Sequence, residues 1–153
     1  MLYNIVNNFL ESEIFDPLVT LLNGNKFPWY LYANYHYHNV YRRGETTEYW
    51  PLFEPIINKL PNLKEIIRVK ANLYHKTTQP TRLWWHKDMP QSHYGCLISI
   101  NTCNGGLALG SEDNYITIPS VANQCVFFDP GKFHSATTCS NNEWRININI
   151  NWF

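Results

Sequence analysis

A histidine and an aspartate two positions apart, His86 and Asp88, are the residues whose types and spacing point most directly to chemistry. Alternate side chains of a β-strand point to the same face, so these two groups would lie together while Lys87 points away. One imidazole and one carboxylate are two of the three protein ligands of a non-haem iron site, in which further coordination positions stay open. The pair therefore predicts a metal centre that needs a third ligand from a distant part of the chain.

Two histidines follow the pair, and one of them lies where a strand would begin. His93 is in a polar segment that we expect to be a loop, whereas His134 follows the turn signal Asp129-Pro130-Gly131. We therefore expect His134 to be the third ligand. His36 and His38 also share a strand face, but no third ligand accompanies them, so we expect aromatic packing there.

Arg145 comes after a second turn signal, Ser140-Asn141-Asn142. A hairpin across this turn would hold His134 at the metal and let Arg145 reach further into the same pocket. A buried guanidinium needs an anion and matches a carboxylate with two parallel hydrogen bonds. Arg145 therefore predicts a ligand that carries a carboxylate.

The elements that would position these groups are two helices followed by short strands. Apolar spacing predicts helices over Glu11–Leu22, with Asp16 as a cap because Pro17 suits a first turn, and over Glu48–Leu60, where Pro55 divides the helix. The predicted strands are Glu65–Tyr74, Arg82–Asp88, Tyr94–Asn101, Leu107–Gly110, Tyr115–Ile118, Gln124–Phe128, His134–Cys139 and Trp144–Phe153. This order predicts a mostly β protein with α (α+β), a double-stranded β-helix (cupin-like jelly roll) backed by N-terminal helices. We expect one domain over 1–153, with a helical support layer over about 1–63 and the roll over about 64–153.

Two predicted strands have polar faces that should point into the roll. Residues 144–151 alternate strictly, with isoleucines on one face and Arg145, Asn147, Asn149 and Asn151 on the other. Residues 67–74 alternate in the same way, with Arg68, Lys70, Asn72 and Tyr74 on the polar face. Amides inside a roll need hydrogen-bond partners, so these faces predict a binding cavity.

Composition argues against nonspecific nucleic-acid binding, although a local basic groove stays possible. The 153 residues include twelve basic and twelve acidic side chains, so no overall charge favours nucleic acid or an anionic membrane. No apolar segment is long enough to cross a membrane, and the N-terminus lacks the pattern of a secretion signal, so we expect a cytoplasmic protein. The four cysteines form no CxxC pair, and we expect them to be reduced and buried.

The ordered set His86-x-Asp88, His134, Arg145 resembles the Fe(II)- and 2-oxoglutarate-dependent dioxygenases, and within them the prolyl-4-hydroxylase type. The surrounding residues agree with this resemblance: Asn72-Leu73-Tyr74, Gly105-Gly106-Leu107 and Val126-Phe127-Phe128. It covers roughly Lys64–Phe153, with the N-terminal helices matched only in kind.

The resemblance implies a role for each matched residue. His86, Asp88 and His134 would bind Fe(II), and Arg145 would pair with the distal carboxylate of 2-oxoglutarate. Tyr74, Asn72 and Asn147 would lie at the cosubstrate. The sequence departs from the family at Ser99, where some members have a tyrosine, and at Asn149, where a small hydroxyl residue often stands.

The activity implied is hydroxylation of a C–H bond in a peptide or protein residue, an amino acid or a small molecule. It consumes O2 and converts 2-oxoglutarate to succinate and CO2, and no residue beyond the metal ligands is needed as a catalytic acid or base. Two alternatives stay open. Arg145-Ile146-Asn147 also resembles the alkylation-repair nucleic-acid demethylases, although the step from His134 is short for them. A cupin-like metal-binding protein without oxygenase activity is the other, although many cupins lack the carboxylate ligand and the inward arginine.

Overall fold

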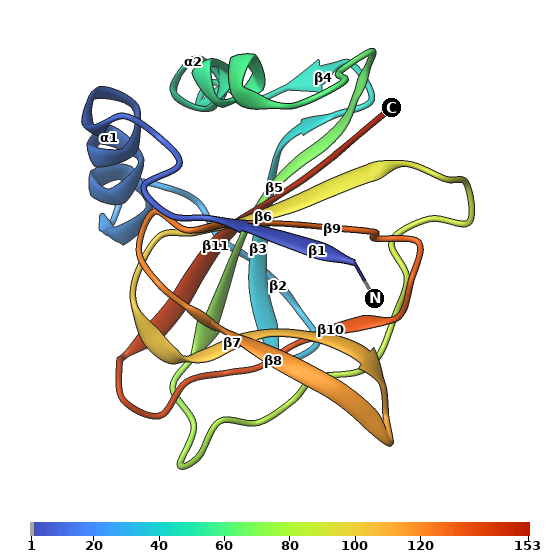
Figure 1. Cartoon of the computed structure of the whole chain (residues 1–153). Helices are drawn as coiled ribbons and strands as arrows, with labels where there is room; N and C mark the ends of the chain where they lie inside the picture. The colour runs from blue at the N-terminus through green and yellow to red at the C-terminus, as the bar shows by residue number, and fades with distance from the viewer. Residues whose placement is uncertain (1) are drawn as a thin grey trace.

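The computed structural model describes residues 2–153, which fold as two antiparallel sheets with helices on one side (Figure 1). The first part of the chain contains β1 (Tyr3–Val6), α1 (Ser12–Asn23), β2 (Tyr30–Tyr32), β3 (Tyr35–Arg42), β4 (Glu45–Thr46), α2 (Trp50–Phe53) and the 3-10 helix η1 (Glu54–Lys59). The strands that follow are β5 (Ile66–His75), β6 (Tyr94–Ser99), β7 (Cys103–Ser111), β8 (Asn114–Ser120), β9 (Cys125–Phe128), β10 (His134–Ala136) and β11 (Trp144–Trp152).

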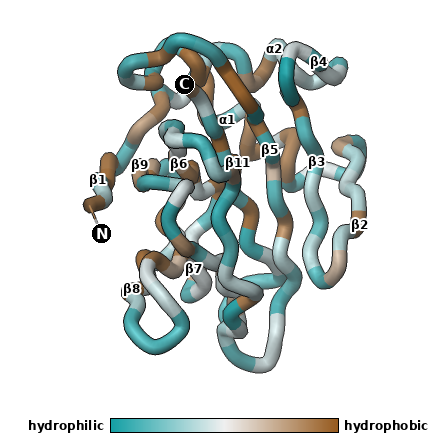
Figure 2. Tube along the Cα trace, turned by 90° about the vertical axis from the view of Figure 1, so that its right-hand side faces the viewer, coloured by the Kyte–Doolittle hydropathy of each residue, from teal (hydrophilic) through white to brown (hydrophobic). Residues whose placement is uncertain are grey.

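The larger sheet has the strand order β1-β9-β6-β11-β5-β3-β2, with β4 paired to β3, and Figure 2 shows the strands in this sequence. The smaller sheet has the order β10-β7-β8. Residues 82–88 run along the free edge of β10 through isolated bridges at Arg82–Thr137 and His86–His134. Two facing antiparallel sheets connected in this way confirm the predicted double-stranded β-helix.

The expected helical support layer is only partly helical. β1 pairs with β9, and β3 pairs with β5, so strands from the first 63 residues extend the larger sheet at both ends. Residues 30–46, an aromatic and polar segment, form β2, β3 and β4. Pairing of β3 with β5 satisfies backbone groups of this segment, and local spacing does not reveal such a non-local effect. The division of the domain near residue 63 stays a prediction.

The first helix covers almost the range that apolar spacing predicts, but it is not capped at Asp16 and begins about one turn before that residue. Glu11, not Asp16, is its N-cap residue, and Pro17 lies inside the helix. The extra turn brings Ile14 and Phe15 against the core, which offsets the one backbone hydrogen bond that Pro17 cannot make. The second predicted helix divides as expected, into α2 and η1, with Pro55 in the first turn of η1.

The main core lies between the larger sheet and the helices. It contains Leu18 and Leu22 of α1, Phe53 of α2 and the isoleucines of β11. A second cluster fills one half of the roll between the sheets and consists of Leu97, Leu107, Leu109, Ile118, Val126 and Phe128. The other half of the roll is therefore free to hold polar groups.

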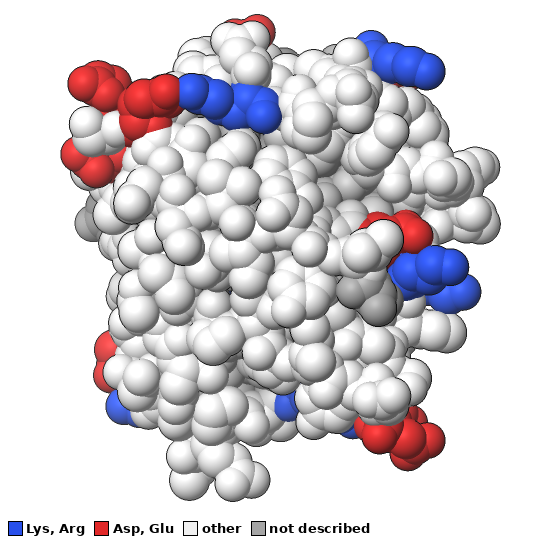
Figure 3. Space-filling view, viewed as in Figure 1, with Lys and Arg blue, Asp and Glu red and all other residues white. Residues whose placement is uncertain are grey.

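The cysteines are in the state that the sequence predicts. All four cysteines are free and buried. The face seen in Figure 3 carries acidic and basic side chains in small separate groups, mostly near its margins. None of the helices in residues 2–153 has the length and apolar character that a membrane crossing requires.

Candidate active site

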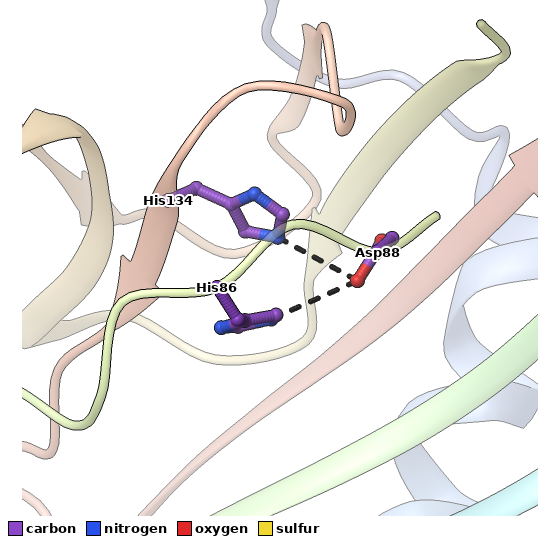
Figure 4. A group of neighbouring side chains, drawn as sticks. All are labelled: His86, Asp88 and His134. Carbon is purple, nitrogen blue, oxygen red and sulfur yellow. Dashed lines mark ion pairs between the residues drawn. The ribbon is translucent and has the colours of Figure 1, made fainter. Parts of the chain in front are cut away.

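His86, Asp88 and His134 meet at one wall of the roll, and their ligand atoms all lie within 4.8 Å of one another (Figure 4). Oδ1 of Asp88 is 3.7 Å from Nε2 of His86 and 3.6 Å from Nε2 of His134. These separations are too long for good hydrogen bonds but place three ligand atoms around one point. Within the described residues this is the one group of three or more His, Cys, Asp or Glu side chains arranged so that they could hold a metal.

Backbone pairing places the two histidines side by side. His86 and His134 donate to each other's carbonyl oxygens at 3.0 Å in both directions. The expected strand over Arg82–Asp88 is wrong in detail, because this segment is extended but makes only isolated bridges. The N–H of Asp88 donates to the carbonyl of Pro130, and Pro130 has no N–H to return, so the regular ladder ends there.

The Asp129-Pro130-Gly131 turn sets the position of His134. Oδ1 of Asp129 accepts the N–H of Gly131 at 2.9 Å, and its carbonyl accepts the N–H of Lys132 at 3.1 Å. His134 then starts β10 two residues later, buried to 2% exposure. The predicted turn chemistry therefore delivers the third residue of the cluster.

Both imidazoles present Nε2 to the shared point. Nδ1 of His134 lies 2.9 Å from the carbonyl oxygen of Lys132, and Nδ1 of His86 lies 3.4 Å from that of Trp84. A proton held on Nδ1 by a carbonyl leaves the Nε2 lone pair for a metal. Nε2 of His134 is buried and has no hydrogen-bond partner, which is the state expected of a ligand atom.

The other oxygen of Asp88 is held by two residues that sequence reasoning did not single out. Oδ2 accepts Nδ2 of Asn151 at 2.9 Å and lies 3.2 Å from Nη2 of Arg68. Burial alone would raise the pKa of Asp88, but the neighbouring His134 and the charge of Arg68 outweigh it and hold the pKa well below its usual range. The carboxylate is thus ionised with Oδ1 turned to the histidines. The polar alternation of β5 and β11 was the available signal for both residues.

The cluster lies on the wall of a cavity of about 220 Å³. Its lining comes from both sheets, the 82–88 segment and the β2–β3 hairpin: Tyr32, Tyr35, Arg68, Lys70, Asn72, Tyr74, Leu83, Trp84, His86, Lys87, Asp88, Leu97, Leu107, His134, Ser135, Ala136 and Asn149. The predicted binding cavity is therefore present, and the adjacent polar faces of β5 and β11 form one of its walls.

Arg145 lies behind this cavity. The expected hairpin with His134 is wrong, because β10 belongs to the smaller sheet and β11 to the larger one. The guanidinium is fully buried, donating from Nε to Oγ of Ser120 at 2.7 Å and from Nη1 to the carbonyl of Thr137 at 3.2 Å. Its Nη2 has no partner. A buried cation with a free donor is a site for an anion.

Tyr74 separates Arg145 from the cavity. The guanidinium carbon is 5.2 Å from the centre of the Tyr74 ring, and Tyr74 lines the cavity whereas Arg145 does not. Burial, opposed by the charge of Arg145, raises the pKa of Tyr74 to about 12, so its phenol is a neutral donor. Since Arg145 is fully enclosed, a ligand reaches its Nη2 only after a neighbouring side chain moves, and Tyr74 is the neighbour that faces the cavity.

Asn72 and Asn147, which the resemblance placed at the cosubstrate, are buried, and their side-chain amides are incompletely hydrogen-bonded. Nδ2 of Asn72 donates to Oδ1 of Asn147 at 3.0 Å. Oδ1 of Asn72 and Nδ2 of Asn147 are buried without partners. One acceptor and one donor are therefore left for a polar ligand.

Comparison with known proteins supports the fold. No protein-family model and no curated protein matches the sequence. Solved structures do match. A 2OG-Fe(II) oxygenase family oxidoreductase from Burkholderia pseudomallei has a TM-score of 0.74 at 11% identity, over 98% of this chain and 83% of that one. A prolyl hydroxylase from Trichoplax adhaerens, in complex with a hypoxia-inducible-factor peptide, has a TM-score of 0.65 at 16% identity, over 99% and 83%. The chain has the fold of the iron- and 2-oxoglutarate-dependent oxygenases.

A third match shows what this oxygenase fold can hold. It is the epimerase of nogalamycin biosynthesis in complex with Fe3+, alpha-ketoglutarate and nogalamycin RO, with a TM-score of 0.65 at 11% identity, over 99% of this chain and 78% of that one. Among the three matches, one contains a peptide and one a small molecule as the further partner. The oxygenase fold therefore leaves the substrate class of this chain open.

The residues present fit iron and 2-oxoglutarate. Two imidazoles and one carboxylate on one face of the site are the ligand set of non-haem iron oxygenases. The free Nη2 of Arg145 suits the second carboxylate of a keto acid.

The other histidines lie outside the cluster. His38 is buried, with its ring 4.5 Å from that of Phe27, and His36 packs against His75, so aromatic packing is their observed environment. His93 lies in a loop just before β6, as expected, but it is buried. It is 7% exposed, and its Nε2 lies 3.4 Å from Nδ2 of Asn151, which supports Asp88.

Proposed function

We propose that this protein is an Fe(II)- and 2-oxoglutarate-dependent dioxygenase that hydroxylates a C–H bond of a small molecule or a peptide residue. The observation that carries the proposal is the convergence of His86, Asp88 and His134, with the Nε2 atom of each histidine facing one carboxylate oxygen inside the oxygenase fold. When bound, iron and 2-oxoglutarate supply the oxidising chemistry, in which O2 is consumed and succinate and CO2 are formed.

The chain itself would bind the metal and the cosubstrate, orient them and enclose them. His86, Asp88 and His134 would bind Fe(II), and Asn151 and Arg68 would fix the carboxylate plane of Asp88. Arg145 would pair with the distal carboxylate of 2-oxoglutarate, with Tyr74, Asn72 and Asn147 as its polar neighbours. None of these roles needs a proton to leave or reach a side chain.

The direct test is succinate formation. The protein is incubated in air with Fe(II), ascorbate and 2-oxoglutarate, and succinate is measured against the His134→Ala variant under the same conditions. We expect slow substrate-independent turnover that the variant lacks. If the protein forms no succinate and shows no anaerobic metal-to-ligand charge-transfer band, it is a metal-binding roll without oxygenase activity.

A second test separates the metal from the cosubstrate. In Arg145→Gln the guanidinium fork is lost while the metal ligands are intact. We expect metal affinity to be unchanged and 2-oxoglutarate affinity to fall by at least about tenfold, the loss of one charge-assisted hydrogen bond. Unchanged 2-oxoglutarate affinity, measured by calorimetry under nitrogen, would show that Arg145 does not bind the cosubstrate.

A further inference from the structure

Lys70 is one of the three cationic side chains that line the active-site cavity. It lies on β5, next to Asn149 of β11, and both residues line the cavity. Its ammonium donates to the hydroxyl of Tyr35 at 3.3 Å and lies 5.4 Å from the centre of the same ring. No salt bridge to Lys70 occurs among residues 2–153. An ammonium has three donors, so at least one remains for a ligand.

The other two cations of the cavity lining, Arg68 and Lys87, differ from Lys70 in their surroundings. Arg68 pairs with Asp88 at 3.2 Å, and the ammonium of Lys87 is exposed and lies 4.6 Å from the centre of the Phe133 ring. Beside Lys70, Oδ1 of Asn149 is buried without a partner. Lys70 is therefore the half-buried cation of the cavity lining that makes no salt bridge within residues 2–153.

Enclosure makes this charge unfavourable until an anion arrives. Burial, with the nearby charge of Arg68, lowers the pKa of Lys70 to about 8, so the ammonium is still mostly protonated at neutral pH. A partly desolvated charge is stabilised when a carboxylate of opposite charge comes within hydrogen-bonding distance. The position thus favours an anionic ligand over a neutral one.

Charge counting separates this anion from the cosubstrate. A 2-oxoglutarate that uses its keto acid at the metal has one carboxylate left, and Arg145 has the free buried donor for it. Lys70 and Arg145 are the two cations at or behind the cavity that are withdrawn from solvent and form no salt bridge within residues 2–153, whereas Lys87 is exposed. One of them is therefore left over for a second molecule.

Aromatic rings lead from Lys70 to the surface. The ring of Tyr35 lies 5.8 Å from that of Trp84, and the ring of Tyr32 lies 6.2 Å from that of Trp84. Tyr32 and Trp84 are 57% and 42% exposed, although both line the cavity. Exposed aromatic faces beside a cavity bind flat apolar groups by stacking. We call Tyr32, Tyr35 and Trp84 the aromatic wall.

We propose that Lys70 and the hydroxyl of Tyr35 form a carboxylate subsite for the primary substrate, whose ring or apolar body lies against the aromatic wall. The substrate class is then a small organic acid with a flat ring. This inference rests on the proposed oxygenase function and specifies the substrate of that same site.

The experiment uses phenylacetate as the probe and phenylacetamide as its neutral match. The protein is loaded with Mn(II) and 2-oxoglutarate under nitrogen, and each probe is titrated by calorimetry. The variants are Lys70→Met, which keeps the length of the side chain and removes its charge, and Lys87→Met, which does the same to the other lysine of the cavity lining. Thermal unfolding and Mn(II) binding show that each variant is folded.

We expect phenylacetate to bind the wild type, at least about tenfold more weakly to Lys70→Met, and with unchanged affinity to Lys87→Met. Phenylacetamide should bind weakly and equally to all three. Tyr35→Phe, which removes only the hydroxyl, should weaken phenylacetate several-fold and serves if Lys70→Met does not fold.

Three results overturn the inference. The first is equal binding of acid and amide, or no binding of the acid, by the loaded wild type. The second is equal binding of phenylacetate by the wild type and Lys70→Met. The third is a tenfold loss of 2-oxoglutarate affinity in Lys70→Met before any probe is added, which assigns Lys70 to the cosubstrate. If the wild type does not bind 2-oxoglutarate at the loading step, that result contradicts the proposed function and not the Lys70 subsite.

Discussion

The two faces of β11 are almost equally buried, but they differ in how their atoms are paired. Ile146, Ile148 and Ile150 are fully buried and pack into the core that includes the helices. On the opposite face Arg145 and Asn147 are also 0% exposed, yet Arg145 Nη2, Asn147 Nδ2 and Asn149 Oδ1 have no partners. Apolar atoms are satisfied by any close packing, whereas buried polar atoms need a specific partner.

This difference separates stability from function within one strand. The isoleucine face contributes free energy of folding through the area it removes from water. The polar face contributes little net stability and leaves donors and acceptors for ligands. The comparison predicts that substitutions on the first face change unfolding, whereas those on the second change binding.

Ile148→Ala should have the largest effect. Truncating a fully buried isoleucine should lower the free energy of unfolding by about 2–5 kcal/mol, the sum of lost transfer energy and the cavity left behind. Chemical denaturation measures it, and metal affinity of the folded variant should be unchanged. Ile116→Ala, at a β8 isoleucine that is 45% exposed, is the control and should change stability by less than about 0.5 kcal/mol. Equal effects at the two sites would contradict the assignment of β11 to the core.

His134→Ala should act on binding and leave the core intact. Loss of the buried Nε2 removes one of the three ligand atoms, and we expect metal affinity to fall at least about 100-fold, or about 3 kcal/mol. Calorimetry with Mn(II) or Co(II) measures it. His75→Ala, at an exposed histidine at the end of β5, should bind metal like the wild type. A His134→Ala protein with wild-type affinity would rule out the proposed ligand set.

Asn151→Ala tests whether the polar face of β11 supports the metal through Asp88. The change removes the 2.9 Å hydrogen bond to Oδ2 and leaves every proposed ligand in place. We expect metal affinity to fall about tenfold, because the carboxylate is less well oriented. The same metal titration detects it, and a variant that binds metal as tightly as the wild type would limit Asn151 to a structural role.

Asn149→Leu should have the smallest effect on folding and gives the sharpest contrast between the faces. The side chains are similar in size, and Oδ1 of Asn149 has no partner to lose. We therefore expect the free energy of unfolding to stay the same or rise by up to about 1 kcal/mol. A marked loss of stability would mean that the polar face contributes to folding as much as the apolar one.

The candidate metal site was easier to predict from the sequence than the pocket around it. His86 and Asp88 are two residues apart, and His134 follows the turn residues Asp129-Pro130-Gly131. Local sequence patterns therefore indicate all three residues. The hydrogen bond from Asn151 to Asp88 joins residues that are 63 positions apart, and it exists only because β5, β11 and the 82–88 segment come together. Sequence alternation showed that Asn151 points inward but not what it meets.

For Arg145, too, the sequence indicated the direction of the side chain but not its neighbours. Strict alternation on β11 correctly predicted a buried polar face. The predicted hairpin failed, because the chain crosses from one sheet to the other after β10. Thr137 and Ser120 then hold the guanidinium behind Tyr74, a depth that depends on how the two sheets face each other.

The sequence by itself determined the residue types, the strand faces and the turns, because these follow from spacing and local backbone preference. Only the tertiary structure decided which groups are neighbours: Asp88 with Arg68, Arg145 with Tyr74, and Lys70 with Tyr35. Pairing between distant strands sets those contacts through register and sheet packing, and a shift of one residue would turn every polar side chain to the other face.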